Sequence, residues 1–77
     1  MKITVEYLGF LEIDAIKSGD IMELPEGTTA GEVFARLGLQ GSYLKYVLPI
    51  INGTRTGHDQ ALKDGDKLFV YLPVGGG

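Results

Sequence analysis

The segment from Thr29 to Gly38 carries the strongest local signal in this 77-residue chain. Thr29 is a good N-cap residue and Glu32 follows three positions later, which predicts a capping box at the start of a helix. The apolar residues in this segment are spaced as one stripe of that helix: Ala30, Val33, Phe34 and Leu37. Gly38 stands where a glycine commonly ends a helix. Because a helix of about two turns is marginal alone, we expect it to pack on a sheet.

The other segments predict the strands of that sheet. Residues 2–7 alternate between apolar and polar side chains, which is typical of a strand with one buried face. Further strands are expected at residues 20–24, 46–51, 54–56 and 67–73, with turn residues between them. Pro49 cannot donate a ladder hydrogen bond, so its position is expected to face an edge or a bulge. The order of elements predicts an α+β fold, with one helix on one face of a mixed four- to five-stranded sheet.

A chain of this length is enough for one domain. We expect the domain to span residues 1–74 and a flexible glycine tail to span residues 75–77. Its core should lie between the helix and the sheet and should contain Ile3, Val5, Val33, Phe34, Leu37, Leu62, Leu68 and Val70.

Composition narrows the classes of function. The chain has no cysteine, which excludes a disulfide framework, a thiolate metal site and a catalytic thiol. Its net charge of -3 disfavours nucleic acid and anionic membranes as partners, because both prefer a basic surface. We find no signal peptide and no stretch long enough to span a bilayer, so a cytoplasmic protein is expected, monomeric when alone.

His58 is the single histidine and follows Gly57 in a predicted loop. A lone histidine falls short of a metal site or an acid–base constellation. It is therefore interpreted as a solvated loop residue. No catalytic residue and no metal ligand are predicted, and the isolated chain is not expected to be an enzyme.

The chain ends in Gly75-Gly76-Gly77, directly after an apolar strand-like run. Glycine has no Cβ atom, so such a tail can enter a narrow cleft and adopt φ values closed to other residues. A partner enzyme could then grip the Gly77 carboxylate and activate it. The alternative is a frayed end without function, as termini often are.

The last strand separates its side chains into two groups. Leu68, Val70 and Leu72 share one face, and Phe69 and Tyr71 share the other. Because one helix covers one face only, Phe69 and Tyr71 are expected outside, next to the tail. With Pro73 they form a predicted partner surface, since aromatic residues are frequent hot spots of protein interfaces. The alternative is cross-strand packing under a loop.

Taken together, several segments resemble the β-grasp sulfur carriers, the ubiquitin-like MoaD and ThiS proteins of molybdopterin and thiamin biosynthesis. The resembling segments are Ile3-Thr4-Val5, residues 24–29 before the helix, Asn52-Gly53, residues 62–68 with the turn Asp64-Gly65-Asp66, and residues 72–77. The resemblance implies a ubiquitin-like fold. Molybdopterin-synthase small subunits often carry two prolines before the glycines, and thiamin carriers often end in Val-Gly-Gly-Gly without proline. This tail has one proline, so the pathway stays open.

The resemblance also implies a carrier and not a catalyst. In this family an ATP-dependent ThiF/MoeB-like enzyme adenylates the C-terminal carboxylate, which then becomes a thiocarboxylate. Gly77 would be the reacting residue, and Gly75 and Gly76 would be needed to reach the nucleotide. The chain itself would bind no cofactor, because ATP belongs to the partner.

The sulfur acceptor implied by the resemblance is thiazole synthase or the large subunit of molybdopterin synthase. In the second case the chain would be the non-catalytic small subunit of that synthase. Two alternatives stay open. One is a ubiquitin-like modifier conjugated through Gly77, and the other is a β-grasp interaction module that uses the sheet face without carrier chemistry.

Overall fold

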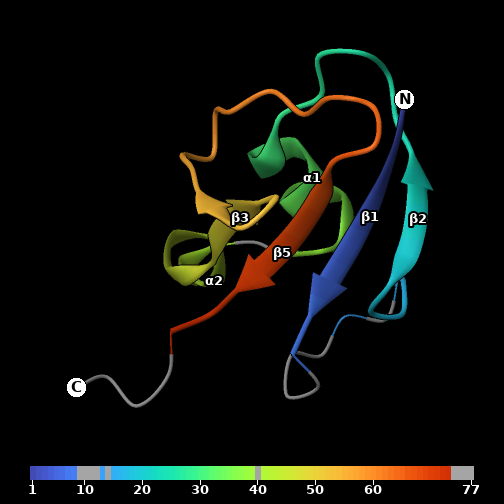
Figure 1. Cartoon of the computed structure of the whole chain (residues 1–77). Coiled ribbons are helices and arrows are strands. Elements are labelled where there is room, and N and C mark those ends of the chain that lie inside the picture. Colours follow the sequence, from blue (N-terminus) through green and yellow to red (C-terminus); the bar gives the residue numbers. More distant parts are fainter. Residues whose placement is uncertain (9–12, 14, 40, 74–77) are drawn as a thin grey trace.

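The computed structural model describes residues 1–8, 13, 15–39 and 41–73. The strands are β1 (Lys2–Tyr7), β2 (Asp20–Glu23), β3 (Leu48–Ile51), β4 (Thr54–Arg55) and β5 (Lys67–Tyr71), and the helices are α1 (Ala30–Arg36) and α2 (Ser42–Tyr46). The five strands form one sheet in the order β2-β1-β5-β3-β4 (Figure 1). β1 and β5 run parallel, and the other pairs are antiparallel. The predicted α+β fold with a mixed sheet is confirmed.

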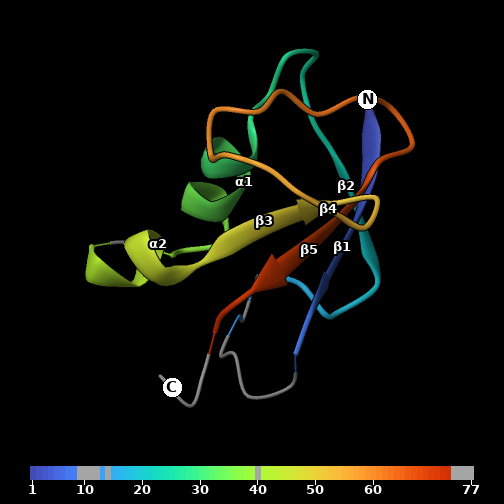
Figure 2. The ribbon, with the colours of Figure 1, turned by 60° about the vertical axis from the view of Figure 1, so that its left-hand side comes forward.

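Both helices lie on the same side of the sheet, and neither covers the other side (Figure 2). The core fills the space between the helices and the sheet. All eight residues predicted for it are buried, and they are joined by Ile13, Leu24, Ala30, Leu39, Val47 and Ile51. Phe34, on the inner face of α1, is completely buried, which confirms the helical register derived from the sequence.

α1 begins and ends where the sequence predicts. The Thr29 hydroxyl accepts a hydrogen bond from the Glu32 backbone N–H at 3.2 Å, and the Glu32 carboxylate accepts one from the Thr29 N–H at 3.1 Å. These two bonds are the capping box. Hydrogen bonds from the Thr29 backbone and hydroxyl lower the pKa of Glu32 below its ordinary value. Gly38 follows the helix with φ of 85°, a backbone conformation that glycine adopts readily.

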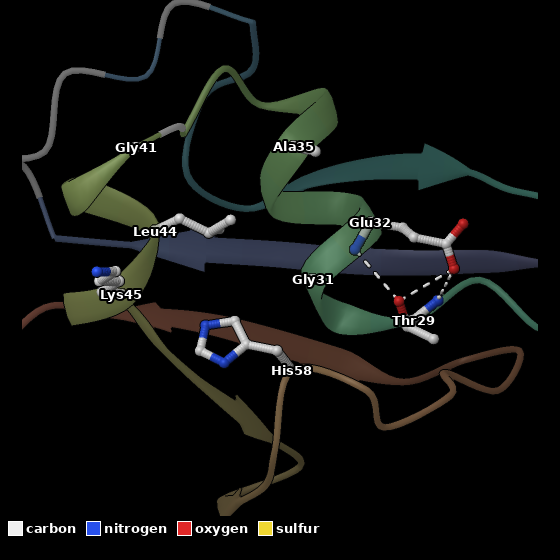
Figure 3. A pocket seen from close by; sticks show the side chains of 8 residues that line it. All are labelled: Thr29, Gly31, Glu32, Ala35, Gly41, Leu44, Lys45 and His58. Carbon is white, nitrogen blue, oxygen red and sulfur yellow. Dashed lines mark hydrogen bonds between the residues drawn. The ribbon is translucent and has the colours of Figure 1, made fainter.

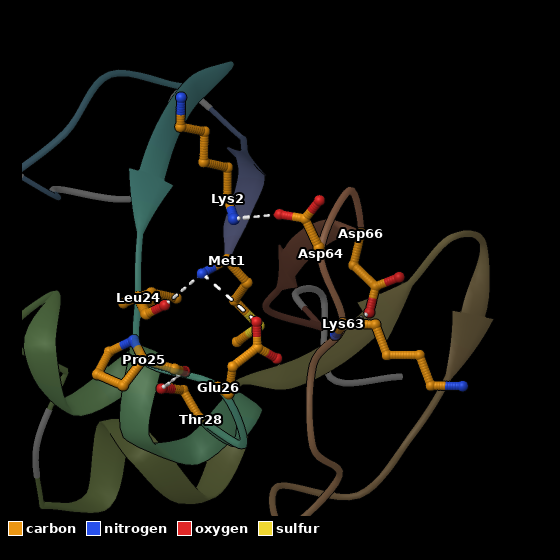
Figure 4. Close-up of polar contacts among 9 residues, drawn as sticks. All are labelled: Met1, Lys2, Leu24, Pro25, Glu26, Thr28, Lys63, Asp64 and Asp66. Carbon is orange, nitrogen blue, oxygen red and sulfur yellow. Dashed lines mark hydrogen bonds and ion pairs between the residues drawn. The ribbon is translucent and has the colours of Figure 1, made fainter.

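The turn Asp64-Gly65-Asp66 sets β5 beside β1. The Asp64 carboxylate accepts a hydrogen bond from the Lys2 backbone N–H at 2.7 Å (Figure 4). The Gly65 N–H donates to the Lys2 carbonyl at 2.8 Å, with φ of 86° at the glycine. The start of β1 and the start of β5 are thereby fixed to each other.

The expectation of a strand starting at Tyr46 is wrong. Residues 42–46 form the short helix α2, and β3 begins only at Leu48. Val47, between the two elements, is completely buried, and Leu44 packs against the core from α2. Burial of these two apolar side chains outweighs the strand preference of an aromatic residue such as Tyr46.

Pro49 was expected to face an edge or a bulge, but it lies in β3, which has neighbours on both sides, opposite the point where β4 ends. β4 pairs only with Ile50 and Ile51. The Pro49 carbonyl accepts a hydrogen bond from the Thr56 N–H at 3.0 Å, so the side of Pro49 that has no donor faces the end of β4. The missing N–H therefore leaves no gap in the ladder between β3 and β5.

Among the described residues, neither helix has the length or apolar character needed to cross a membrane.

Candidate functional site

Alternation along β5 divides its side chains between the two faces of the sheet. Leu68 and Val70 are completely buried under the helices, whereas Phe69 is half-buried and Tyr71 is 38% exposed. The two rings lie on the outer face with centroids 6.5 Å apart and an interplanar angle of 36°. The predicted position of Phe69 and Tyr71, on the face away from the helices, is thus confirmed.

β3 adds two apolar residues to the same face. Leu48 lies opposite Tyr71 and Ile50 lies opposite Phe69 in the antiparallel ladder. Residues directly opposite each other share a face, so Leu48, Ile50, Phe69 and Tyr71 form one group, which we call the outer apolar patch. Both β3 residues are half-buried.

Leu48 and Ile50 were not predicted as part of this surface. Residues 46–51 are almost continuously apolar, which hides the alternation that is visible in β1. In the structure, Pro49 and Ile51 are buried and Leu48 and Ile50 are half-buried, so the strand does alternate between the two faces of the sheet. Knowing that the strand starts at Leu48 would have placed both residues on the outer face.

Charged residues flank the outer apolar patch on two strands. Glu6 on β1 lies opposite Phe69, and Arg55 on β4 lies opposite Ile50. Lys67 Nζ lies 4.0 Å from Glu6 Oε1, and both side chains are well exposed. Such an exposed pair contributes little to stability, so these charges belong to the surface and not to the core.

The chain leaves the sheet beside the outer apolar patch. β5 ends at Tyr71, Leu72 packs against the core, and Pro73 is exposed. Gly75, Gly76 and Gly77 lie outside the described residues, so their predicted role stays a prediction. The same holds for the roles of Phe69, Tyr71 and Pro73 in partner binding.

His58 is not the solvated residue that the sequence suggested. Its ring packs edge-on against Phe34, with centroids 5.5 Å apart and an interplanar angle of 80°. Nε2 is buried and has no hydrogen-bond partner among the residues that the structure describes. The Gly31 N–H donates to the His58 carbonyl at 2.8 Å, and a Cβ atom on Gly31 would lie 3.1 Å from that oxygen. The absence of a side chain at Gly31 therefore lets the loop approach α1.

The His58 ring borders an open groove of about 610 Å³ between α1 and α2 (Figure 3). Leu44 and Ala35 supply apolar walls, and Lys45 stands at the rim. In the part of the chain that the structure describes, no three His, Cys, Asp or Glu residues are grouped so that they could hold a metal ion.

Comparisons with known proteins agree with this arrangement. The model of the ThiS family matches residues 10–77. SAMP1 from Haloferax volcanii has a similar structure, with a TM-score of 0.77 and 18% sequence identity over 100% of both chains. A protein assigned as molybdopterin converting factor, subunit 1, from Pyrococcus furiosus has a TM-score of 0.71 and 26% identity over 95% of this chain and 98% of that chain. Both are ubiquitin-like β-grasp proteins, which identifies the fold. No curated protein sequence matches.

Proposed function

Because this chain belongs to the ThiS family, we propose that it is a sulfur carrier whose C-terminal carboxylate is adenylated and then converted to a thiocarboxylate. The observation that carries the proposal is the extent of the family match, which runs from residue 10 to the last glycine. The outer apolar patch supports it, because it gives a partner enzyme a place to hold the domain beside the strand that leads to the tail.

The proposed chemistry needs no side chain of the carrier. A carboxylate oxygen of Gly77 attacks the α-phosphorus of ATP, the bond to pyrophosphate breaks, and an acyl-adenylate forms. A sulfur nucleophile then attacks the carbonyl carbon, and AMP leaves with the bonding electron pair. Gly75 and Gly76 serve this reaction by having no Cβ atom, so the chain can pass through a narrow cleft to the nucleotide.

The domain surface has to compensate for ordering the tail. Fixing the backbone of one residue costs about 1–2 kcal/mol, and glycine loses more freedom than other residues. Contacts of the tail alone recover little, because glycine offers no side chain. Phe69 and Tyr71, now joined by Leu48 and Ile50, are the residues that we expect to supply the binding free energy.

The proposal covers two possible sulfur acceptors, thiazole synthase and the large subunit of molybdopterin synthase. The family match favours the first, and the similar structure from Pyrococcus furiosus favours the second. A modifier conjugated through Gly77 would share the acyl-adenylate and differ only in the nucleophile that consumes it.

The test is incubation of the purified chain with MgATP, sulfide and the activating enzyme of the same organism, followed by mass spectrometry of the intact protein. We expect the mass increase that corresponds to replacing one oxygen by sulfur at Gly77. A matched variant with one extra residue after Gly77 should stay unchanged, since that residue moves the carboxylate by about 3.5 Å.

Two other outcomes would overturn the proposal. If the activating enzyme is shown to be active on another carrier and still produces no mass change in this chain, the interaction module is favoured. Amide-linked conjugates to lysine residues, found in place of a thiocarboxylate, would favour the protein modifier.

A further inference from the structure

Four residues form a row across the outer face of the sheet. Phe69 lies opposite Glu6 on β1 and opposite Ile50 on β3, and Ile50 lies opposite Arg55 on β4. Opposite residues of neighbouring strands share a face. Two apolar side chains of the outer apolar patch therefore stand between an acidic residue at one end and a basic residue at the other.

The two charged ends of this row are not equivalent. Glu6 has a basic neighbour, Lys67, whose Nζ lies 4.0 Å from its carboxylate. Arg55 is exposed, and within the described ranges no carboxylate lies within 4.0 Å of its guanidinium group. In a chain with a net charge of -3, Arg55 is a positive charge at the edge of an apolar surface that is available to a partner.

An apolar patch alone does not fix the orientation of a docked domain. Hydrophobic contact is non-directional, so the domain could rotate about the normal to the patch and swing the end of β5 away from the partner's cleft. Arg55 lies two strands away from β5, a lateral distance of about 10 Å. A directional contact at that distance from β5, off the centre of the patch, would fix the rotation.

We infer that Arg55 orients this carrier on its activating enzyme, and that the enzyme presents an aspartate or glutamate carboxylate to the guanidinium group. The inference rests on the proposed function. A guanidinium binds a carboxylate through two parallel hydrogen bonds, which sets an angle as well as a distance. Arg55 touches no reacting atom and acts as a positioning residue for the tail.

The test measures ATP–pyrophosphate exchange by the activating enzyme as a function of carrier concentration. Arg55→Glu places like charges together and is expected to raise the KM for the carrier about tenfold or more. Arg36→Glu is the matched control, because it makes the same charge change on α1, which covers the opposite face of the sheet. Arg55→Lys should bind better than Arg55→Glu because it keeps the positive charge. It should bind less well than the native chain because lysine lacks the planar guanidinium group.

Salt dependence gives a readout that a purely structural role would not change. The KM of the native carrier should rise with salt, and that of Arg55→Gln should rise much less, because the screened charge pair is absent. Equal melting temperatures of the variants serve as the control for folding. If Arg55→Glu and Arg36→Glu have the same KM, the inference is wrong. If the native carrier supports no exchange at all, the proposed function fails and the inference fails with it.

Discussion

Asn52 Nδ2 donates a hydrogen bond to Asp66 Oδ1 at 2.8 Å and so joins two turns that are 14 residues apart in the sequence. The other amide atom, Asn52 Oδ1, accepts from the Lys67 backbone N–H at 2.9 Å, and the second carboxylate oxygen of Asp66 accepts from the Lys63 N–H at 2.8 Å. The turn between β3 and β4 is thereby fixed to the first residue of β5, the strand that carries Phe69 and Tyr71.

We expect Asn52→Ala to destabilise the domain by about 2 kcal/mol, because two hydrogen bonds are lost and alanine is strained at a positive φ. The φ of Asn52 is 51°. Asn52→Gly removes the same hydrogen bonds without the strain, so it should lose about half as much. Urea unfolding of both variants checks this. Equal stability of Asn52→Ala and the native chain would mean that the amide contacts contribute nothing.

The capping box makes stability depend on pH. The pKa of Glu32 lies below its ordinary value of 4.5 in the folded chain, because its carboxylate accepts hydrogen bonds from Thr29. A lowered carboxyl pKa adds stability that is fully present above about pH 4.5 and is lost as the pH falls through the folded pKa. The stability difference between the native chain and Glu32→Gln should therefore shrink below about pH 4.5.

Urea unfolding of the native chain and Glu32→Gln, from about pH 7 to about pH 3, measures this difference. In a Thr29→Ala background the pH dependence attributable to Glu32 should be smaller, because the hydroxyl donor is gone. A difference between the native chain and Glu32→Gln that is constant across the range would contradict the assignment.

His58 Nε2 is buried and has no hydrogen-bond partner within the described part of the chain, which predicts an unusual result for its substitution. An unsatisfied buried polar group costs about 1–3 kcal/mol, so His58→Phe, which keeps an aromatic ring beside Phe34, should leave the domain as stable as the native chain or more stable. His58→Ala should be less stable, because it loses the edge-on contact with Phe34. Melting temperatures of the two variants give the answer. A large loss with His58→Phe would show that the imidazole has a polar partner in solution.

Alanine substitutions in the outer apolar patch should weaken binding to the activating enzyme and leave the fold intact. For Phe69→Ala or Tyr71→Ala we expect a loss on the order of 2 kcal/mol each, as for aromatic anchors at other interfaces. Ile21→Ala is the matched control, because Ile21 lies opposite Thr4 on the same face, is 67% exposed and stands on β2, outside the patch. Calorimetric titration measures all three. An equal loss for Ile21→Ala would mean that the interface extends over the whole face.

Short sequence patterns correctly predicted β1 and α1, because neighbouring residues in the chain determine both elements. β1 spans residues 2–7 as expected from its alternation, and α1 has the expected capping box, apolar stripe and terminal glycine. α2 could not be predicted in this way, because a helix of five residues is stabilised by the packing of Leu44 and Val47 against distant parts of the chain.

The environment of His58 likewise could not be predicted from local sequence signals. Its ring is held against α1 because Gly31, 27 positions earlier, leaves room for the loop and donates a hydrogen bond to the His58 carbonyl. Nothing within a few residues of His58 signals this contact. For a related reason, only the two residues of the outer apolar patch on β5 were predicted. The two residues on β3 join the patch through the register between β3 and β5, which the sequence does not show.

The place of β5 in the middle of the sheet has a mechanical consequence. β5 is hydrogen-bonded to β1 on one side and to β3 on the other, and Pro73 follows two residues after its end. A force applied beyond Pro73 and directed along β5 would load both ladders in shear, with many hydrogen bonds sharing the load, and would not peel an edge strand away one bond at a time. If the proposed function holds, the activating enzyme can therefore draw the C-terminal segment into its cleft under tension while the domain stays folded at the entrance.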